Sequence, residues 1–248
     1  MTVHRFYILD RLSPNASGRL SAEQARQAGK VLRLRPGDEI VVFDGTGSEY
    51  TGTLAEADRD GWEFATDEGR WPEREPRLRL TVGIALIRNE RFELAVQKLT
   101  ELGVTRIVPL AAERSVISYS DARRWHNRRA RLERIIIEAA EQSERVTLPD
   151  LDAPLTVSEF LGRNAEMDII ALVERTGTTP LGAIRPGGQV ALMIGPEGGW
   201  APREVEQIGA AGATLANMGA LILRAETAAI VAAGHLIIAS ATEGSSTS

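Results

Sequence analysis

From residue 78 onward, strand-length apolar runs alternate with segments whose apolar residues recur at helical spacing. In NERFELAVQKLTELG, for example, Phe92, Val96 and Leu99 fall on one helical face. Apolar strands that alternate with amphipathic helices are typical of a mostly parallel sheet covered by helices on both faces. We therefore predict an α/β fold for this part of the chain. Its expected strands are LRLTVGIALI (78–87), TRIVPLA (105–111), MDIIALVE (167–174), GQVALMIG (188–195) and ATLANMG (213–219).

The beginning of the chain has a different pattern, in which short alternating segments are separated by glycine turns. This pattern predicts a small β-barrel. Ser21 and Gln24 have the spacing of a capping box and predict one helix among the strands. The proline-broken, charged segment WPEREPRLR (71–79) is the expected linker, so we place one domain over residues 1–72 and another over 73–248. The expected strands of the first domain lie within EIVVFDG (39–45), EYTGTLAEA (49–57) and GWEFATDE (61–68).

The composition excludes several kinds of site. The 248 residues include no cysteine, which rules out disulfides and thiolate ligands, and the three histidines stand far apart, so we expect no metal site. Because the net charge is −5, nucleic-acid binding would need a local basic face. The N-terminus lacks an apolar core of signal-peptide length, and the apolar stretch 226–241 is too short to span a bilayer. We expect a cytoplasmic protein.

The segment IGPEGGW (194–200) follows an expected strand and has the glycines and proline of a sharp turn. In open α/β sheets, ligands collect at the carboxyl ends of strands. The chain has no Gly-Lys-Ser/Thr and no G-x-G-x-x-G, and Glu197 would repel a phosphate. A cationic ligand with an adenine ring, such as S-adenosylmethionine, fits this loop. The alternative is a structural turn with an exposed acid.

A second candidate loop, NMGALILRAET (217–227), runs directly into an apolar helix. Glu226 and Thr227 stand at the helix start, where an acid and a hydroxyl suit the unpaired backbone N–H groups. The helix is apolar nearly all round, which predicts burial against something larger than one face of the sheet. A subunit interface would provide this, and an ordinary core helix is the alternative. The third candidate loop is LVERTG, which begins at the carboxyl end of the expected strand MDIIA.

Seven segments of the chain form an ordered set of motifs: HRFYI (4–8), VLRLRPGD (31–38), KLTELGV (98–104), PLAAERS (109–115), EAAEQSER (138–145), IGPEGGW (194–200) and ILRAETA (222–228). Taken in this order, they resemble one family, the SPOUT-class bacterial methyltransferases that modify uracil N3 in small-subunit ribosomal RNA. The sequence departs from that family at two places: Gln27 lies near a position where histidine is common, and Ala220-Leu221 stands where Pro-Arg is common.

The resemblance implies a PUA-like β-barrel that binds RNA and a SPOUT domain whose parallel sheet contains a deep trefoil knot. It also implies S-adenosylmethionine as the cofactor, a homodimer, and small-subunit ribosomal RNA or the assembled small subunit as the substrate. A related SPOUT enzyme with another target atom, or a non-catalytic RNA-binding homologue, is the alternative function.

Site residues follow from the loops and the resemblance together. Arg224 or Arg145 would stabilise negative charge on the uracil oxygens, and Glu226 would take the N3 proton. Glu226 as a mere helix-start acid, and Arg145 as a structural bridge to a carboxylate such as Glu141, are the alternatives. The expected cofactor-binding residues are Leu172, Gly195, Glu197, Gly198, Met218, Gly219 and Leu223. The expected RNA-binding residues are Arg5, Arg33, Arg114, Arg123 and Arg124, the last two from the arginine run RRWHNRRARLER (123–134), which could instead be a solvated face.

Overall fold

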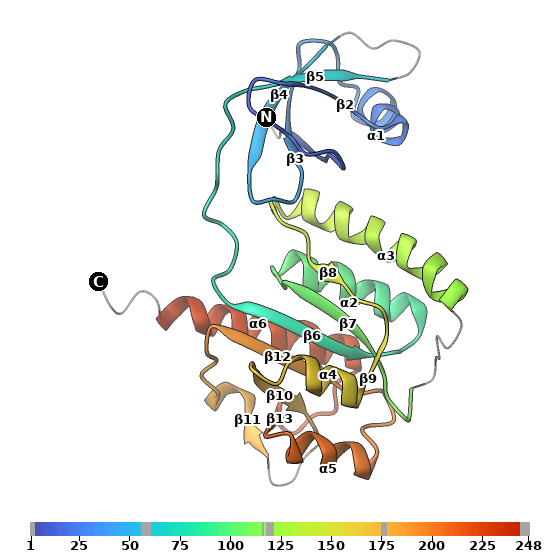
Figure 1. Ribbon diagram of the computed structural model, residues 1–248, viewed down its shortest axis with the longest axis vertical. Helices are drawn as coiled ribbons and strands as arrows, with labels where there is room; N and C mark the ends of the chain where they lie inside the picture. The colour runs from blue at the N-terminus through green and yellow to red at the C-terminus, as the bar shows by residue number, and fades with distance from the viewer. Residues whose placement is uncertain (1–2, 56–60, 116, 118–121, 175–177, 244–248) are drawn as a thin grey trace. The chain divides into compact units, whose positions relative to one another are not determined.

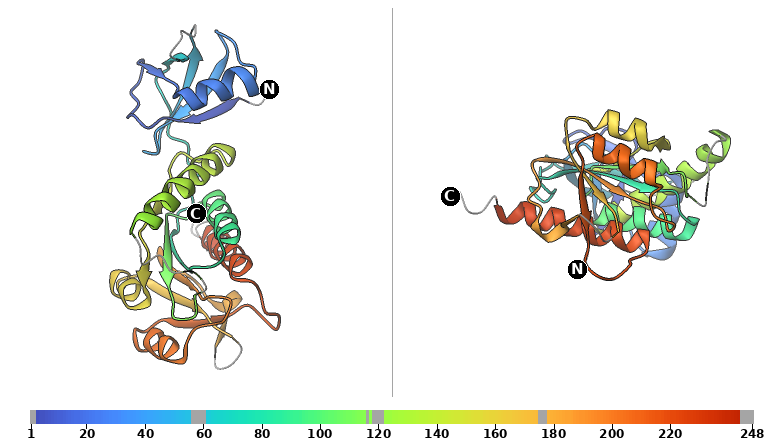
Figure 2. Two further views of the ribbon diagram at one scale, coloured as in Figure 1. Left: turned by 90° about the vertical axis from the view of Figure 1, so that its right-hand side faces the viewer. Right: turned by 90° about the horizontal axis from the view of Figure 1, so that it is seen from below.

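The computed structural model describes residues 3–55, 61–115, 117, 122–174 and 178–243 (Figures 1 and 2). The chain divides into two compact units. The first, which we call the N-terminal unit, contains residues 1–75 and 140–148. The second, the C-terminal unit, contains residues 76–139 and 149–248.

The N-terminal unit is built on a five-stranded sheet in the order β1-β3-β4-β5-β2. β1 runs parallel to β3, and the other neighbours are antiparallel. The predicted strands of this unit are confirmed, and its core packs around Phe6, Ile40 and Phe64. The strands are β1 (His4–Tyr7), β2 (Ser17–Arg19), β3 (Glu39–Phe43), β4 (Glu49–Leu54) and β5 (Glu63–Thr66).

The predicted capping box is present, but the helix it begins is short. Ser21 and Gln24 exchange backbone-to-side-chain hydrogen bonds of 3.0 and 3.3 Å. Helix α1 (Ala22–Arg26) then continues as a single π-helical turn over Gln27–Val31. The helix expected from the sequence is therefore divided into two kinds of turn.

A buried carboxylate ties three arginines to this unit. Glu49 is fully buried and accepts hydrogen bonds from Arg5 (2.8 Å), Arg70 (2.7 Å) and Arg74 (3.0 Å). Burial acts to raise the pKa of Glu49, but hydrogen bonds and Coulomb attraction from the arginines outweigh it, so the pKa lies below its ordinary value. The carboxylate is therefore charged at neutral pH and stabilises the unit.

We expect Glu49→Gln to lower the free energy of unfolding by about 2 kcal/mol at pH 7, because hydrogen bonds to a buried charge are lost. Since the folded-state pKa is depressed, this stabilisation is complete above the ordinary carboxyl pKa and disappears as pH falls through the folded value. The difference between variant and native chain should therefore shrink below about pH 4. Urea unfolding at pH 7 and pH 3 measures it. Glu63→Gln, which breaks an exposed pair with Arg19, is the control and should change stability by less than about 0.5 kcal/mol.

The C-terminal unit is built on an eight-stranded sheet in the order β11-β13-β10-β12-β6-β7-β8, with β9 also paired to β7. Every strand pair in this sheet is parallel, which confirms the predicted α/β class. Its strands are β6 (Arg79–Ala85), β7 (Arg106–Ala111), β8 (Asp150–Leu151), β9 (Leu155–Thr156), β10 (Asp168–Leu172), β11 (Thr179–Pro180), β12 (Gln189–Ile194) and β13 (Thr214–Asn217).

Helices cover both faces of this sheet. α2 and α6 pack together on one face, and α4 and α5 lie on the other (Figures 1 and 2). The predicted apolar face of α2 is buried, with Phe92, Val96 and Leu99 no more than 3% exposed. The helices are α2 (Asn89–Glu101), α3 (Ala122–Gln142), α4 (Val157–Arg163), α5 (Pro202–Ala210) and α6 (Ala225–Glu243).

Helix α6 is buried on one side only. Ala229, Ala233 and Leu236 are fully buried, whereas Val231 and Ile238 are 50% and 67% exposed. The composition of α6 predicted burial on all sides, but within the single chain only one side of the helix is buried. Among the described residues, no helix is long and apolar enough to cross a membrane.

Candidate active site

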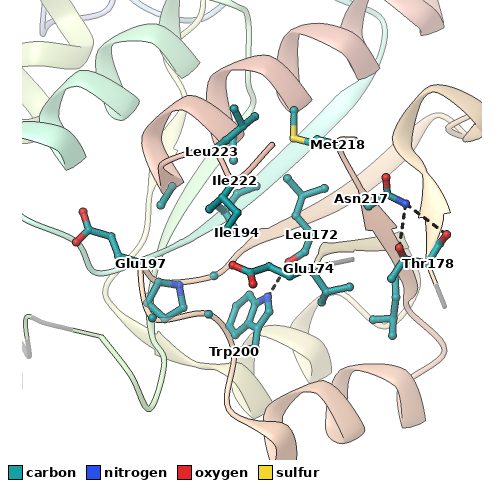
Figure 3. Close-up of a pocket in the computed structure, with 18 of the residues that line it drawn as sticks. Leu172, Glu174, Thr178, Ile194, Glu197, Trp200, Asn217, Met218, Ile222 and Leu223 are labelled. Carbon is teal, nitrogen blue, oxygen red and sulfur yellow. Dashed lines mark hydrogen bonds between the residues drawn. The ribbon is translucent and has the colours of Figure 1, made fainter. Parts of the chain in front are cut away.

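Three strand ends meet at one edge of the parallel sheet. β10 lies between β12 and β13, and Leu172 is in register with both Ile194 and Ala216. The loops that follow these strands therefore leave the sheet at the same level. They enclose a pocket of about 420 Å³ (Figure 3). The three loops of this pocket are the three that the sequence indicated.

The glycine loop after β12 is fixed to the end of β10 by a tryptophan. The Trp200 indole N–H donates a 2.9 Å hydrogen bond to the carbonyl oxygen of Leu172. A Cβ on Gly195 would lie 2.9 Å from that indole nitrogen, and Gly199 has φ +69°. Glycine is needed at position 195 because a side chain there would overlap the indole. It is needed at position 199 because the backbone there is left-handed.

The loop after β13 is held by an asparagine. Asn217 donates a 2.9 Å hydrogen bond to the hydroxyl of Thr178, and its amide oxygen accepts one of 3.1 Å from the N–H of Gly219. Gly219 has φ +95°, which favours glycine. These contacts order the loop before any ligand binds.

The structure brings all the residues predicted to bind the cofactor to this pocket. Their side chains and bare backbone form its wall, and Arg114, predicted to bind RNA, lines it as well. The Arg114 guanidinium donates a 3.1 Å hydrogen bond to the carbonyl of Gly198. The predicted residues in the lining are Leu172, Gly195, Glu197, Gly198, Met218, Gly219 and Leu223.

Glu226 lies beside the pocket in the first turn of α6, next to Ala225, which lines it. Its side chain is 7% exposed, and its Oε1 is 3.7 Å from Nε of Arg91. Its Oε2 is buried without a hydrogen-bond partner in the described part of the chain. Arg91 also pairs with Glu197, so one guanidinium bridges the glycine loop and α6. Arg224 precedes α6 and is exposed.

Arg145 is placed in the N-terminal unit, and it does not line the pocket. It is 5% exposed, and its guanidinium pairs with Glu75 at 3.0 Å. Burial acts to raise the pKa of Glu75, but attraction to Arg145 and several hydrogen bonds lower it overall. These contacts agree with the structural alternative, in which Arg145 bridges to a carboxylate, here that of Glu75. A catalytic role for Arg145 stays a prediction.

The arginines predicted to bind RNA differ in exposure. Arg33 and Arg124 are exposed, whereas the Arg5 side chain is 7% exposed and bonded to Glu49. The side chain of Arg123 lies outside the described residues. Further along the arginine run, Arg128 and Arg131 both pair with Glu93 on α2, which neutralises part of that face.

Several residues of the site were not predicted from the sequence. Glu174, in the loop after β10, turns its carboxylate toward the middle of the pocket-lining residues, while that of Glu197 lies at their edge (Figure 3). The position of Glu174 directly after a strand was the available signal. Arg91 and Trp200 had none, because their partners are distant in sequence, whereas Asn217 had a local signal in Gly219 two residues later.

The chain matches two family models. Residues 73–237 match the RNA methyltransferase domain, and residues 20–64 match the RNA methyltransferase PUA domain. The predicted PUA-type domain is thereby confirmed.

Named relatives and solved structures agree with these matches. Ribosomal RNA small subunit methyltransferase E of Synechocystis is 35% identical over 88% of this chain and 71% of its own length. That of Rickettsia conorii is 29% identical over 94% of each chain. The Neisseria gonorrhoeae enzyme of the same name, solved bound to S-adenosylmethionine, is 32% identical and superimposes with a TM-score of 0.85 over 94% of this chain and 95% of its own. The fold, the pocket and these matches together show that the chain belongs to the RNA methyltransferase family.

Proposed function

We propose that the chain transfers a methyl group from S-adenosylmethionine to N3 of a uridine in small-subunit ribosomal RNA. The observation that carries the proposal is the pocket at the ends of β10, β12 and β13, which contains every residue predicted to hold the cofactor. The names of the relatives support the RNA class, and the resemblance supplies the target atom.

The pocket fits this cofactor. Bare glycine backbone and apolar side chains such as Leu172 and Leu223 suit an adenine ring, and the volume is that of a small-ligand site. The carboxylate of Glu174 suits a positively charged ligand and would oppose a phosphate, whereas that of Glu197 is already paired with Arg91. When bound, S-adenosylmethionine supplies an electrophilic methyl group. The chain itself contributes positioning, which is worth on the order of 7–11 kcal/mol in the best intramolecular cases.

The proton on uracil N3 sets the remaining requirements. N3 lies on the base-pairing edge, so the uridine must be unpaired or flipped out. We propose that Oε2 of Glu226 accepts the N3 proton, because it is shielded from solvent and free of protein partners. Arg91 holds the other oxygen of this carboxylate in place. Arg224, exposed just before α6, would stabilise the negative charge that develops on the uracil oxygens.

We propose that the PUA-type domain, taken as residues 1–72, binds RNA together with exposed arginines around the pocket and on α3. The exposure of Arg33 and Arg124 and the position of Arg114 in the pocket lining support this role, and Arg123 stays a prediction. Arg5 would need to leave Glu49 to contact RNA. We propose free ribosomal RNA or the assembled small subunit as the substrate, and the cytoplasm as the place where the enzyme acts.

We further propose a homodimer. The outer face of α6 exposes Val231 and Ile238, and the preceding loop exposes Leu221 and Ile222 at 81% and 66%. Leu221 and Ile222 also line the pocket, whereas the apolar groups exposed on α6 favour contact with a second chain. The trefoil knot is a separate expectation, which the resemblance alone supports. Sedimentation of the purified chain tests the dimer.

The test of function is nucleoside analysis. Small subunits from cells that lack this gene are incubated with the chain and the cofactor, and the digested RNA is examined by mass spectrometry. Appearance of 3-methyluridine is the expected result. A ribose-methylated or other methylated nucleoside would favour a related SPOUT activity. No transfer, together with no cofactor binding in calorimetry, would favour a non-catalytic RNA-binding homologue.

Glu197→Lys should weaken cofactor binding about tenfold. The new ammonium would stand beside Arg91 and place two cations at the edge of a site for a cationic ligand. Calorimetric titration measures the dissociation constant. Glu206→Lys, an equal charge change at an exposed position of α5, is the control and should bind as the native chain does. Equal affinities for the Glu197 variant and the native chain would remove this loop from the site.

A further inference from the structure

An exposed aromatic ring lies in the N-terminal unit and is not among the residues that line the pocket. Trp71 is 68% exposed, and it is the only aromatic among the large exposed hydrophobic residues in the described part of the chain. An indole combines a large apolar face with one polar N–H group. An exposed ring of this kind offers a flat apolar face on which another ring can stack.

The backbone that carries this ring is rigid. Arg70 and Glu49 exchange two backbone hydrogen bonds of 2.9 Å, which fix the residue before Trp71 to strand β4. Gly69 has φ +79°, and a Cβ there would lie 2.5 Å from the Tyr50 ring. Pro72 restricts Trp71 to an extended conformation. The backbone that carries the indole is therefore ordered before a ligand binds.

Arg70, which directly precedes Trp71, belongs to a cluster of charged side chains. Three guanidiniums, from Arg5, Arg70 and Arg74, surround the buried carboxylate of Glu49, and Arg74 also pairs with Glu144. Arg70 uses its Nε for this contact, and its side chain is 60% exposed. Its two Nη groups have no partner among the described residues, so a fixed and partly free guanidinium lies next in sequence to the indole.

We propose that Trp71 and Arg70 form a binding site for a single-stranded segment of the RNA substrate. An unpaired base stacks on the indole, and the Nη groups of Arg70 donate hydrogen bonds to a neighbouring phosphate. A duplex keeps the faces of its bases stacked internally, so it would contact the arginine alone. This inference rests on the proposed function, because it assumes an RNA substrate.

The experiment is a titration of the full-length chain with a labelled single-stranded RNA of about ten nucleotides and with a hairpin of the same length, followed by anisotropy over a range of salt. Trp71→Ala should weaken single-strand binding about tenfold at every salt concentration. Trp71→Phe should lose less than about threefold, because phenylalanine keeps a stacking face. Arg70→Gln should reduce the slope of log affinity against log salt by about 0.7, the value for one phosphate contact on a single strand.

Leu9→Ala is the matched control, since Leu9 is 87% exposed in the same unit but has no aromatic face. The proposal is overturned if Trp71→Ala and Leu9→Ala bind the single strand equally well, or if Trp71→Ala weakens the hairpin as much as the single strand. A changed oligomeric state of Trp71→Ala, with unchanged RNA affinity, would also overturn it and assign the ring to a protein contact. If the native chain methylates RNA and Trp71→Ala binds the single strand normally, this site is wrong but the proposed function stands. If the native chain neither methylates nor binds RNA, the proposed function is wrong.

Discussion

Gly195→Ala is expected to weaken cofactor binding about 100-fold. The added Cβ would lie 2.9, 3.0 and 3.2 Å from three atoms of the Trp200 indole. The ring cannot move away easily, because it is 7% exposed and its N–H is bonded to the Leu172 carbonyl at 2.9 Å. Relief of the overlap must therefore displace either the glycine loop or the end of β10. Overpacking of this kind costs about 1–3 kcal/mol, and each 1.4 kcal/mol is tenfold in affinity.

Calorimetry of the variant with S-adenosylmethionine measures this effect, and Gly188→Ala is the matched control. Gly188 precedes β12 at the opposite end of the same strand, and a Cβ there would meet nothing within 4 Å. The control should bind the cofactor normally and unfold at the same urea concentration as the native chain. Normal binding by Gly195→Ala would show that the ligand does not depend on the contact between this loop and Trp200.

Those parts of the fold that depend on local sequence were predictable. The predicted Ser21–Gln24 capping box is observed, since it depends on residues within one turn. The pocket could also be placed, because parallel strands bring their carboxyl ends to one edge of the sheet. What remained open was which three strands lie side by side.

Contacts between residues distant in sequence could not be predicted. Arg91 pairs with Glu197, 106 positions away. The negative charge that the sequence assigned to the glycine loop is therefore already balanced in the folded chain. Arg5 is similarly occupied by Glu49, 44 positions away, so a basic residue in a family segment became part of a buried cluster. Periodicity and motif spacing carry no information on such pairs.

Glu226→Gln is expected to reduce the rate of methyl transfer about 1,000-fold, within the range for loss of a proton-transfer group. Glutamine has nearly the same shape, and its amide oxygen can still face Arg91, so the N-terminus of α6 should stay in place. Its amide nitrogen, however, carries two hydrogens and cannot take the N3 proton. The measurement is a single-turnover assay with cofactor and RNA both saturating, paired with calorimetry of cofactor binding.

The comparison of rate with affinity separates two roles for this carboxylate. A proton acceptor predicts a large loss of rate with a cofactor dissociation constant that changes less than about threefold, because the group acts on the uracil and not on the cofactor. A helix-start acid that only stabilises α6 predicts equal, small losses in rate, affinity and stability. Glu90→Gln makes the same charge change at an exposed position one residue before Arg91 and should leave the rate unaltered. If Glu226→Gln transfers the methyl group at the native rate, another group must accept the N3 proton. The buried Oε2, which has no partner among the described residues, would then have no role in the chemistry.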